Sequence, residues 1–306
     1  MKSKIIAVAN MKGGVGKTAT VVGLAEVLAA ELVETLVIDL DPQANASICF
    51  AGSSTLRSLI KKGHTIDGFL QDRIFDKKQT DFEDCIRTNV SNVSHMGTQL
   101  PVSLLASSSR LRLIERELIY KLTKSGLSLD RIVDLIYNLL KEQLSQTRTS
   151  YRYILIDCPP GISVLTEVSL RLADMVIVPT IPDFLSTYGL QSFCSNLWTG
   201  EIANETKLKK PKKPHVLITR RRPTREQNLT TTKLYLERRR KPPKFNIFET
   251  EVPEMAAIAE ALGKVEKVDV DGNIDKPWPT LSQKWKGSAP FLESLAEEVK
   301  EILHGA

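Results

Sequence analysis

Apolar residues along the chain follow two alternating spacings. Continuous, often β-branched apolar runs predict buried strands at residues 5–9, 35–41, 102–106, 153–157, 174–182, 215–220 and 247–253. Apolar residues at helical spacing predict helices over residues 17–31, 55–62, 65–70, 108–123, 127–144, 184–197 and 290–304, and a further helix beginning near residue 225. Strands that are apolar on both faces are typical of parallel sheets covered on both sides. The pattern predicts a doubly wound α/β fold, with a mostly parallel sheet flanked by helices, as one domain over residues 1–306.

A glycine-rich segment joins the first predicted strand to the first predicted helix. Residues 12–18 read Lys-Gly-Gly-Val-Gly-Lys-Thr. In such a turn, backbone N–H groups surround an anion, and the helix N-terminus adds its partial positive charge. Lys17 would reach the β- and γ-phosphates of a nucleotide, and the Thr18 hydroxyl would bind Mg²⁺. The segment is a P-loop with an irregular start, because Met11 stands where the usual pattern has glycine and Lys12 is an additional lysine.

Carboxylates follow two of the other predicted strands. Asp39 and Asp41 end the run at residues 35–41, and Asp157 ends the run at 153–157, ahead of Cys-Pro-Pro and Gly161. The carboxyl ends of parallel strands lie at one edge of a sheet, where ligands bind. An acid at the end of a buried strand can hold a water on Mg²⁺ beside the γ-phosphate, and Gly161 can sense that phosphate through its backbone. The sequence therefore predicts one site for nucleotide and magnesium.

These three motifs, in this order, resemble the ParA/MinD family of deviant Walker A ATPases, and the ParA branch most of all. The resemblance implies that Lys12 crosses a dimer interface to the partner's nucleotide and that Asp41 positions the attacking water. It places Thr219, Arg220 and Pro253 beside the adenine. The expected catalytic residues are Lys12, Lys17 and Asp41, and the expected metal site comprises Thr18, Asp39 and Asp157. The expected ATP contacts are Lys12, Gly13, Gly14, Val15, Gly16, Lys17, Thr18, Ala19, Asp157, Gly161, Thr219, Arg220 and Pro253.

Positive charge is concentrated in one region of the chain. Residues 207–244 hold fifteen lysines and arginines against two glutamates, whereas the whole chain has a net charge of +6, so the remainder is acidic. Three adjoining basic clusters favour a surface that contacts phosphate backbones without reading sequence. The expected DNA contacts are Arg220, Arg221, Arg222, Arg225, Arg238, Arg239, Arg240 and Lys241. Many ParA proteins instead place DNA-binding arginines after the last strand, where this chain has no basic residue between Val252 and Ile258.

The resemblance implies an ATP-dependent homodimer that binds non-specific DNA and moves a plasmid, a chromosome or a protein assembly through a ParB-like or other adaptor. One rival is a membrane-associated MinD-like ATPase, but the polar face of the helix at 290–304 is acidic, and an anionic membrane would repel it. Another rival is a metabolic relative such as a nitrogenase-type reductase or an amidotransferase synthetase. The four cysteines form no C-x-x-C pair and none lies in a glycine-rich loop, which disfavours the reductase. We expect a cytoplasmic, nucleoid-associated protein with no membrane partner.

Overall fold

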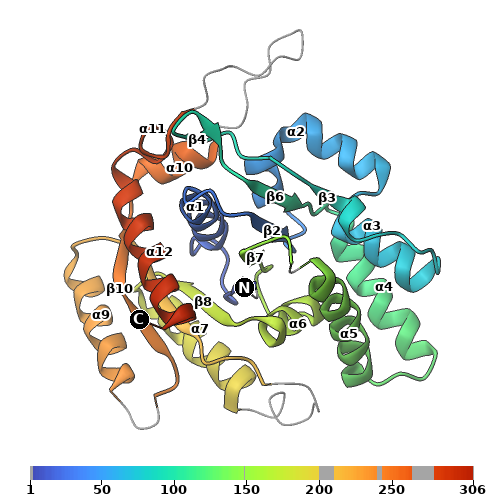
Figure 1. Cartoon of the computed structure of the whole chain (residues 1–306). Coiled ribbons are helices and arrows are strands. Elements are labelled where there is room, and N and C mark those ends of the chain that lie inside the picture. The colour runs from blue at the N-terminus through green and yellow to red at the C-terminus, as the bar shows by residue number, and fades with distance from the viewer. Residues whose placement is uncertain (1–2, 148, 200–209, 240–242, 264–278, 306) are drawn as a thin grey trace.

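The fold is built around one mixed sheet, in which the described residues form eight strands. The computed structural model describes residues 3–147, 149–199, 210–239, 243–263 and 279–305. Within these residues the strand order is β10-β9-β8-β1-β7-β2-β6-β3, and neighbours are parallel except β3 and β6 (Figure 1). The strands are β1 (Lys4–Val8), β2 (Thr35–Asp39), β3 (Ile86–Arg87), β6 (Val102–Leu105), β7 (Tyr153–Asp157), β8 (Met175–Thr180), β9 (His215–Arg221) and β10 (Asn246–Pro253). Two short strands, β4 (Ser94–His95) and β5 (Thr98–Gln99), form a separate hairpin.

Helices cover both faces of this sheet. They are α1 (Lys17–Ala29), α2 (Asn45–Lys62), α3 (Ile66–Leu70), α4 (Leu111–Lys124), α5 (Leu129–Thr147), α6 (Val164–Leu172), α7 (Phe184–Cys194), α9 (Arg225–Arg238), α10 (Ala256–Gly263), α11 (Leu281–Trp285) and α12 (Ala289–His304). Successive residues of β1 alternate between the two cores, with Ile5 and Ala7 in one and Ile6 and Val8 in the other. This alternation is the physical basis of a doubly wound sheet, and the predicted fold class is confirmed.

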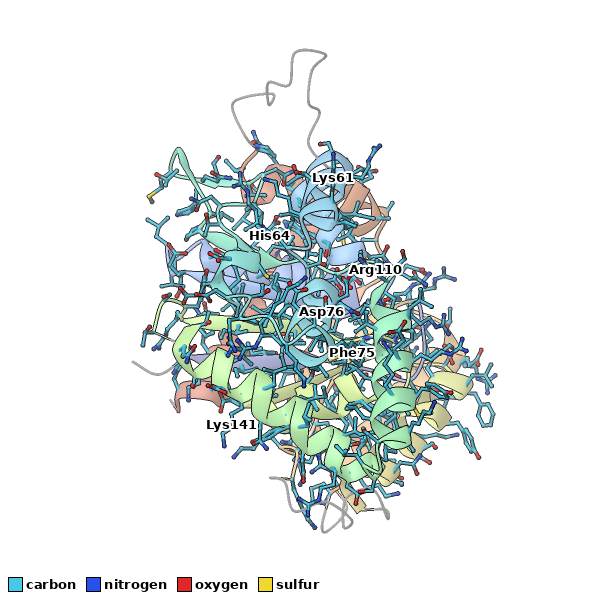
Figure 2. All side chains as sticks on the ribbon, turned by 90° about the vertical axis from the view of Figure 1, so that its right-hand side faces the viewer. Lys61, His64, Phe75, Asp76, Arg110 and Lys141 are labelled. Atoms are coloured by element: carbon cyan, nitrogen blue, oxygen red, sulfur yellow. The ribbon has the colours of Figure 1, made fainter. Side chains whose placement is uncertain are left out.

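The two layers contain different helices. Buried residues of α1 and α12 belong to one core, and those of α4, α5, α6 and α7 belong to the other. Figure 2 views the molecule from the side of α3, α4 and α5, where Lys61, Asp76 and Lys141 are exposed. The acidic helix predicted at the end of the chain is α12, and its apolar side packs on α1 through residues such as Leu292, Leu295 and Val299.

Several local features differ from the sequence predictions. Helices α6, α10 and α11 and the short strands β3, β4 and β5 were not predicted. Helix α2 begins ten residues before the expected helix, with a break at Gly52, where φ is 69°. Strand β2 ends at Asp39 rather than Asp41. The last difference matters for the site because Asp41 lies beyond the strand, in the loop that leads to α2.

Candidate functional site

The predicted P-loop connects β1 to α1 at the carboxyl edge of the sheet. Gly14 and Gly16 have φ angles of 74° and 90°, in the left-handed region that favours glycine, and Gly16 is the N-cap of α1. The Lys17 ammonium is buried and donates a hydrogen bond to the backbone carbonyl of Lys12 at 3.1 Å. Burial lowers the pKa of Lys17, and the nearby Asp157 and Asp41 oppose that shift. The loop therefore curls around a lysine held at its centre.

Asp157 lies directly beside this loop. Its Oδ2 atom accepts a hydrogen bond from the Thr18 hydroxyl at 2.8 Å. Its Oδ1 atom is buried and has no hydrogen-bond partner among the described residues. Burial raises the pKa of Asp157 well above its ordinary value, and the charge of Asp39, its register partner across β2 and β7, raises it further. A buried carboxylate oxygen without a partner, next to a hydroxyl, is the donor set that Mg²⁺ accepts when phosphates and water complete its shell.

The two aspartates after β2 have different surroundings. The Asp39 carboxylate accepts hydrogen bonds from the Asp41 N–H at 3.0 Å and from the N–H and hydroxyl of Ser47 at 2.8 and 2.7 Å. Burial raises the pKa of Asp39 to about 6, although the Ser47 hydrogen bonds oppose the shift. Asp39 thus fixes the loop to α2, and its part in metal binding stays a prediction. Asp41 lines the cavity described below, and its carboxylate accepts the Gln43 N–H at 2.9 Å.

Lys12 points to α7 instead of into its own P-loop. Its ammonium donates a hydrogen bond to the Ser186 hydroxyl at 2.9 Å and lies 3.6 Å from the carboxylate of Asp183. Asp183 also caps α7 by accepting the Ser186 N–H at 2.7 Å. The Lys12 side chain is 39% exposed, so it remains accessible from outside the protomer.

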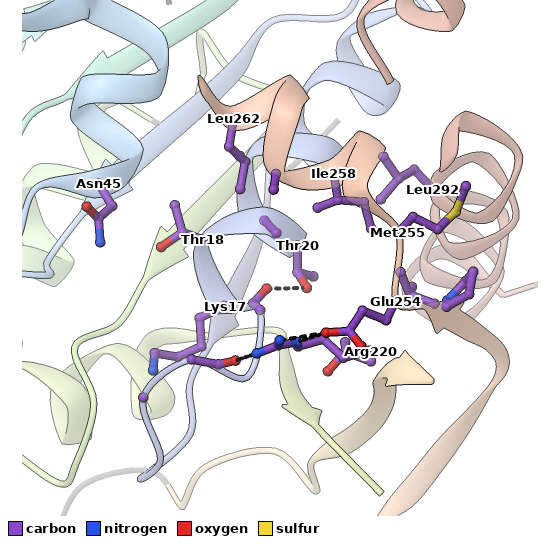
Figure 3. Close-up of a pocket in the computed structure, with 18 of the residues that line it drawn as sticks. Lys17, Thr18, Thr20, Asn45, Arg220, Glu254, Met255, Ile258, Leu262 and Leu292 are labelled. Atoms are coloured by element: carbon purple, nitrogen blue, oxygen red, sulfur yellow. Dashed lines mark hydrogen bonds and ion pairs between the residues drawn. The ribbon is translucent and has the colours of Figure 1, made fainter. Parts of the chain in front are cut away.

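A cavity of about 440 Å³ opens next to the P-loop (Figure 3). Its polar end includes Lys17, Thr18 and Asp41. Its apolar end includes Met255 and Ile258, which belong to the segment leading into α10 and to α10 itself. A pocket that is cationic and hydroxylated at one end and apolar at the other suits a nucleotide, with phosphates in the loop and the base on the apolar wall.

Residues at the ends of β9 and β10 also line this cavity. Thr219, Arg220 and Pro253 all line it, as do Gly13, Gly14, Gly16 and Ala19 of the P-loop segment. The Thr219 hydroxyl donates to the Val15 carbonyl at 2.8 Å, and Arg220 Nη1 donates to the Gly14 carbonyl at 3.2 Å. Both residues therefore support the P-loop, and their contact with adenine stays a prediction.

Gly161 has a φ of 101°, and its N–H points to the Asn10 carbonyl at 3.4 Å, so phosphate sensing by Gly161 stays a prediction. The apolar wall formed by Met255, Ile258 and Leu262 was not predicted. The sequence contained an indication of this wall, because apolar residues stand at helical spacing just after Pro253.

The predicted DNA contacts are largely ion-paired within the chain. Glutamates on and just after β10 hold them: Arg221 pairs with Glu251 at 3.0 Å, Arg238 pairs with Glu249 at 2.5 Å, and Arg220 and Arg222 share Glu254. Arg225 and Arg239 are exposed and form no ion pair with any described residue. Arg240 and Lys241 lie outside the described residues. DNA contact by all eight residues stays a prediction.

Comparison with known proteins places the chain in a family. A family model described as an AAA domain matches residues 3–210, which contain all three motifs. The chain belongs to this family. The ParA of Caulobacter vibrioides, described as a chromosome partitioning protein, is 31% identical over 191 residues, which are 61% of this chain and 59% of that protein. The sporulation initiation inhibitor protein Soj of Bacillus subtilis is 29% identical over 195 residues, which are 63% of this chain and 64% of that protein.

These relatives confirm the resemblance to the ParA/MinD family that the motifs predicted. The first relatives are matched over only 62% to 64% of their own length. Two solved structures share the fold over 98% of this chain. McdA of Cyanothece has a TM-score of 0.67 and 19% sequence identity. The structure of pNOB8 ParA bound to nonspecific DNA has a TM-score of 0.63 and 20% sequence identity. The match covers 99% of the McdA chain and 97% of the ParA chain.

A third solved structure has the same fold in a biosynthetic enzyme. Cobyrinic acid a,c-diamide synthase of Mycobacterium smegmatis, with a bound ATP analogue and magnesium, has a TM-score of 0.68 at 19% identity, and the match covers 99% of this chain and 97% of that chain.

Among the described helices of the present protein, none has both the length and the apolar character that crossing a bilayer requires.

Proposed function

We propose that this protein is an ATP-dependent dimerising switch that binds DNA without sequence preference and partitions or positions a cargo. The observation that carries the proposal is the cavity in which Lys17, Thr18 and Asp41 surround the end of the P-loop, with Asp157 hydrogen-bonded to Thr18. Residues of three different strand ends meet there. This arrangement is suited to phosphoryl transfer, where positioning and charge stabilisation provide most of the catalysis.

Each side chain has a defined role in this proposal. The P-loop N–H groups and Lys17 bind the β- and γ-phosphates of ATP, and Thr18 and Asp157 would hold Mg²⁺. When bound, Mg²⁺ neutralises charge that develops on the transferred phosphoryl group. Asp41 orients the attacking water, and Lys12 of a second protomer stabilises the same charge from across the interface. The products are ADP and phosphate.

The proposed partners come from the relatives. A ParA of similar fold is described as bound to nonspecific DNA, and a matched relative is a chromosome partitioning protein. By analogy, the ATP-loaded homodimer of this chain would occupy nucleoid DNA, and a ParB-like adaptor on the cargo would stimulate slow hydrolysis. A small DNA-binding protein encoded by a neighbouring reading frame would be the first candidate for this adaptor.

A biosynthetic role is the second candidate because the fold also matches a cobyrinic acid a,c-diamide synthase. The partition role is favoured by the names of the matched sequence relatives and by the basic residues around β9 and α9. A small-molecule ligase has no need for such a surface.

The enzymatic part of the proposal is tested by ATP turnover of Asp41→Ala. This variant should retain ATP and Mg²⁺, which depend on Lys17, Thr18 and Asp157, but its turnover should fall by about 100-fold because the water is no longer oriented. Phosphate release and equilibrium nucleotide binding measure the two effects separately. Asp84→Ala, at an exposed aspartate far from the motifs in sequence, is the matched control. Turnover of Asp41→Ala at the wild-type rate would show that Asp41 has been given the wrong role.

A further inference from the structure

One carboxylate connects the cavity to the arginines that were predicted to contact DNA. Glu254 Oε1 accepts hydrogen bonds from Arg220 Nε at 3.0 Å and Nη2 at 2.6 Å, and Oε2 accepts from Arg222 Nε. The Glu254 backbone N–H is also fixed, because it donates to the Arg221 carbonyl at 3.0 Å. These hydrogen bonds from Arg222 and Arg220 lower the pKa of Glu254, so the carboxylate is charged at neutral pH. A single glutamate therefore holds two arginines at once, one on each carboxylate oxygen.

The two arginines held by Glu254 face different environments. Arg220 lines the cavity together with Glu254, and its guanidinium also donates to the Gly14 carbonyl of the P-loop. Figure 3 shows this chain of contacts from the P-loop through Arg220 to Glu254. Arg222 does not line the cavity, and its side chain is 61% exposed. Glu254 is thus shared between a ligand-facing arginine and a solvent-facing arginine.

The backbone that holds this arrangement is irregular. Arg220 has a φ of 51°, which is uncommon for a residue with a Cβ, and the β9–β10 pairing changes register between Glu251 and Pro253. Such conformations are energetically unfavourable and are concentrated at sites that switch or clamp ligands. Here the irregular turn directs Arg220 to the P-loop while Arg222 stays outside.

An anion in the P-loop would act on this pair in a definite direction. Negative phosphates attract the Arg220 guanidinium and repel the Glu254 carboxylate, and both effects weaken the hold of Glu254 on its arginines. We infer that Glu254 is an internal competitor of DNA phosphates for Arg222, and that nucleotide in the cavity releases Arg222 to the DNA backbone. This inference rests on the proposed function because it takes ATP and duplex DNA as the two ligands.

The test compares binding of unrelated DNA duplexes without nucleotide. Glu254→Gln should bind them about tenfold more tightly than the wild type, as expected for a coupling of ordinary size. The plot of log affinity against log salt should steepen by about 1, because one more arginine neutralises one more phosphate. Glu226→Gln is the matched control: it removes one exposed negative charge from the first turn of α9, close to the same arginines in sequence. Its affinity should change by no more than about twofold.

A second variant identifies the arginine that is released. Glu254→Gln combined with Arg222→Gln should return nucleotide-free binding to the wild-type level, and a gain that persists in the double variant would overturn the role of Arg222. Equal behaviour of Glu254→Gln and Glu226→Gln, with a wild type that binds DNA when given an ATP analogue, would overturn the inference alone. A wild type and variants that bind no duplex under any nucleotide would overturn both the inference and the proposed DNA partner.

Discussion

The site residues differ in how strongly their surroundings constrain them. Lys17, Asp39 and Asp157 are buried and have shifted pKa values, whereas Lys12 is partly exposed and rests on α7. Buried ionisable groups with shifted pKa values are concentrated at functional sites.

Lys12→Ala should separate nucleotide binding from hydrolysis. In this structure Lys12 contacts Ser186 and Asp183 and does not line the cavity, so its removal should leave ATP affinity nearly unchanged. Hydrolysis should fall by about 100-fold because charge stabilisation from the partner protomer is lost. Nucleotide titration and phosphate release measure both effects, and Lys121→Ala, at an exposed lysine of α4, serves as control. Wild-type hydrolysis by Lys12→Ala would refute a role for this lysine in the reaction.

Asp157→Asn should stabilise the protein when nucleotide and Mg²⁺ are absent. The raised pKa of Asp157 means that the folded state binds this proton more tightly than the unfolded state. The stabilising contribution is therefore present at low pH and is lost as pH rises from the ordinary carboxyl range through the raised pKa. With a chelator present at pH 7.5, the variant should have a higher free energy of unfolding than the wild type, and the difference should vanish near pH 4. Urea unfolding across this pH range measures it, and a variant less stable than the wild type at pH 7.5 would contradict the prediction.

The sequence predicted the P-loop and Asp157 because each is a short motif attached to a strand. It could not predict that Glu254 holds Arg220 and Arg222, since these pairs join residues more than thirty positions apart. Their geometry depends on the irregular register of β9 and β10, which no local pattern encodes.

Among the helices, α6 was missed because it is short and enclosed. Apolar Val164, Leu165, Val168 and Leu172 stand at helical spacing, but α6 has only nine residues, all of them buried, and so short a segment cannot be assigned to a helix or a strand from its pattern alone. Its charged residues, Glu167 and Arg171, satisfy each other by an ion pair at 2.7 Å inside the protein. In contrast, α5 has a distinct polar face, and its predicted range overlaps the observed one closely.

A buried ion pair joins the P-loop helix to α11. Glu26 of α1 accepts hydrogen bonds from the Lys284 ammonium at 2.5 Å and from the Trp285 indole N–H at 2.7 Å, and both charged side chains are at most 1% exposed. The cost of burying these charges is offset only while both partners are present.

Lys284→Met should therefore lower the free energy of unfolding by about 3–5 kcal/mol, because Glu26 is left buried without its cation. Adding Glu26→Gln should recover much of this loss, since the amide carries no charge and can still accept from Trp285. Thermal and urea unfolding of the single and double variants measure the effect. A single variant within about 0.5 kcal/mol of the wild type would show that the pair contributes little.

At the scale of the whole molecule, the proposed function requires a second copy of this chain. The cavity lies at the carboxyl edge of the sheet, and the Lys12 side chain is accessible from outside the protomer. Strand β9, which carries Arg220 and Arg221, is the second strand from one end of the described sheet. Among the described residues, four of the predicted DNA-contacting arginines are paired with internal glutamates, so we expect strong DNA binding to need two protomers side by side. We therefore expect ATP to drive dimerisation.

Light scattering of the purified protein with Mg²⁺ and a non-hydrolysable ATP analogue tests this claim most directly. The account predicts a mass near 34.1 kDa with ADP and about twice that mass with the analogue. A mass that stays near 34.1 kDa in both nucleotide states, under conditions where the analogue is shown to bind, would contradict it.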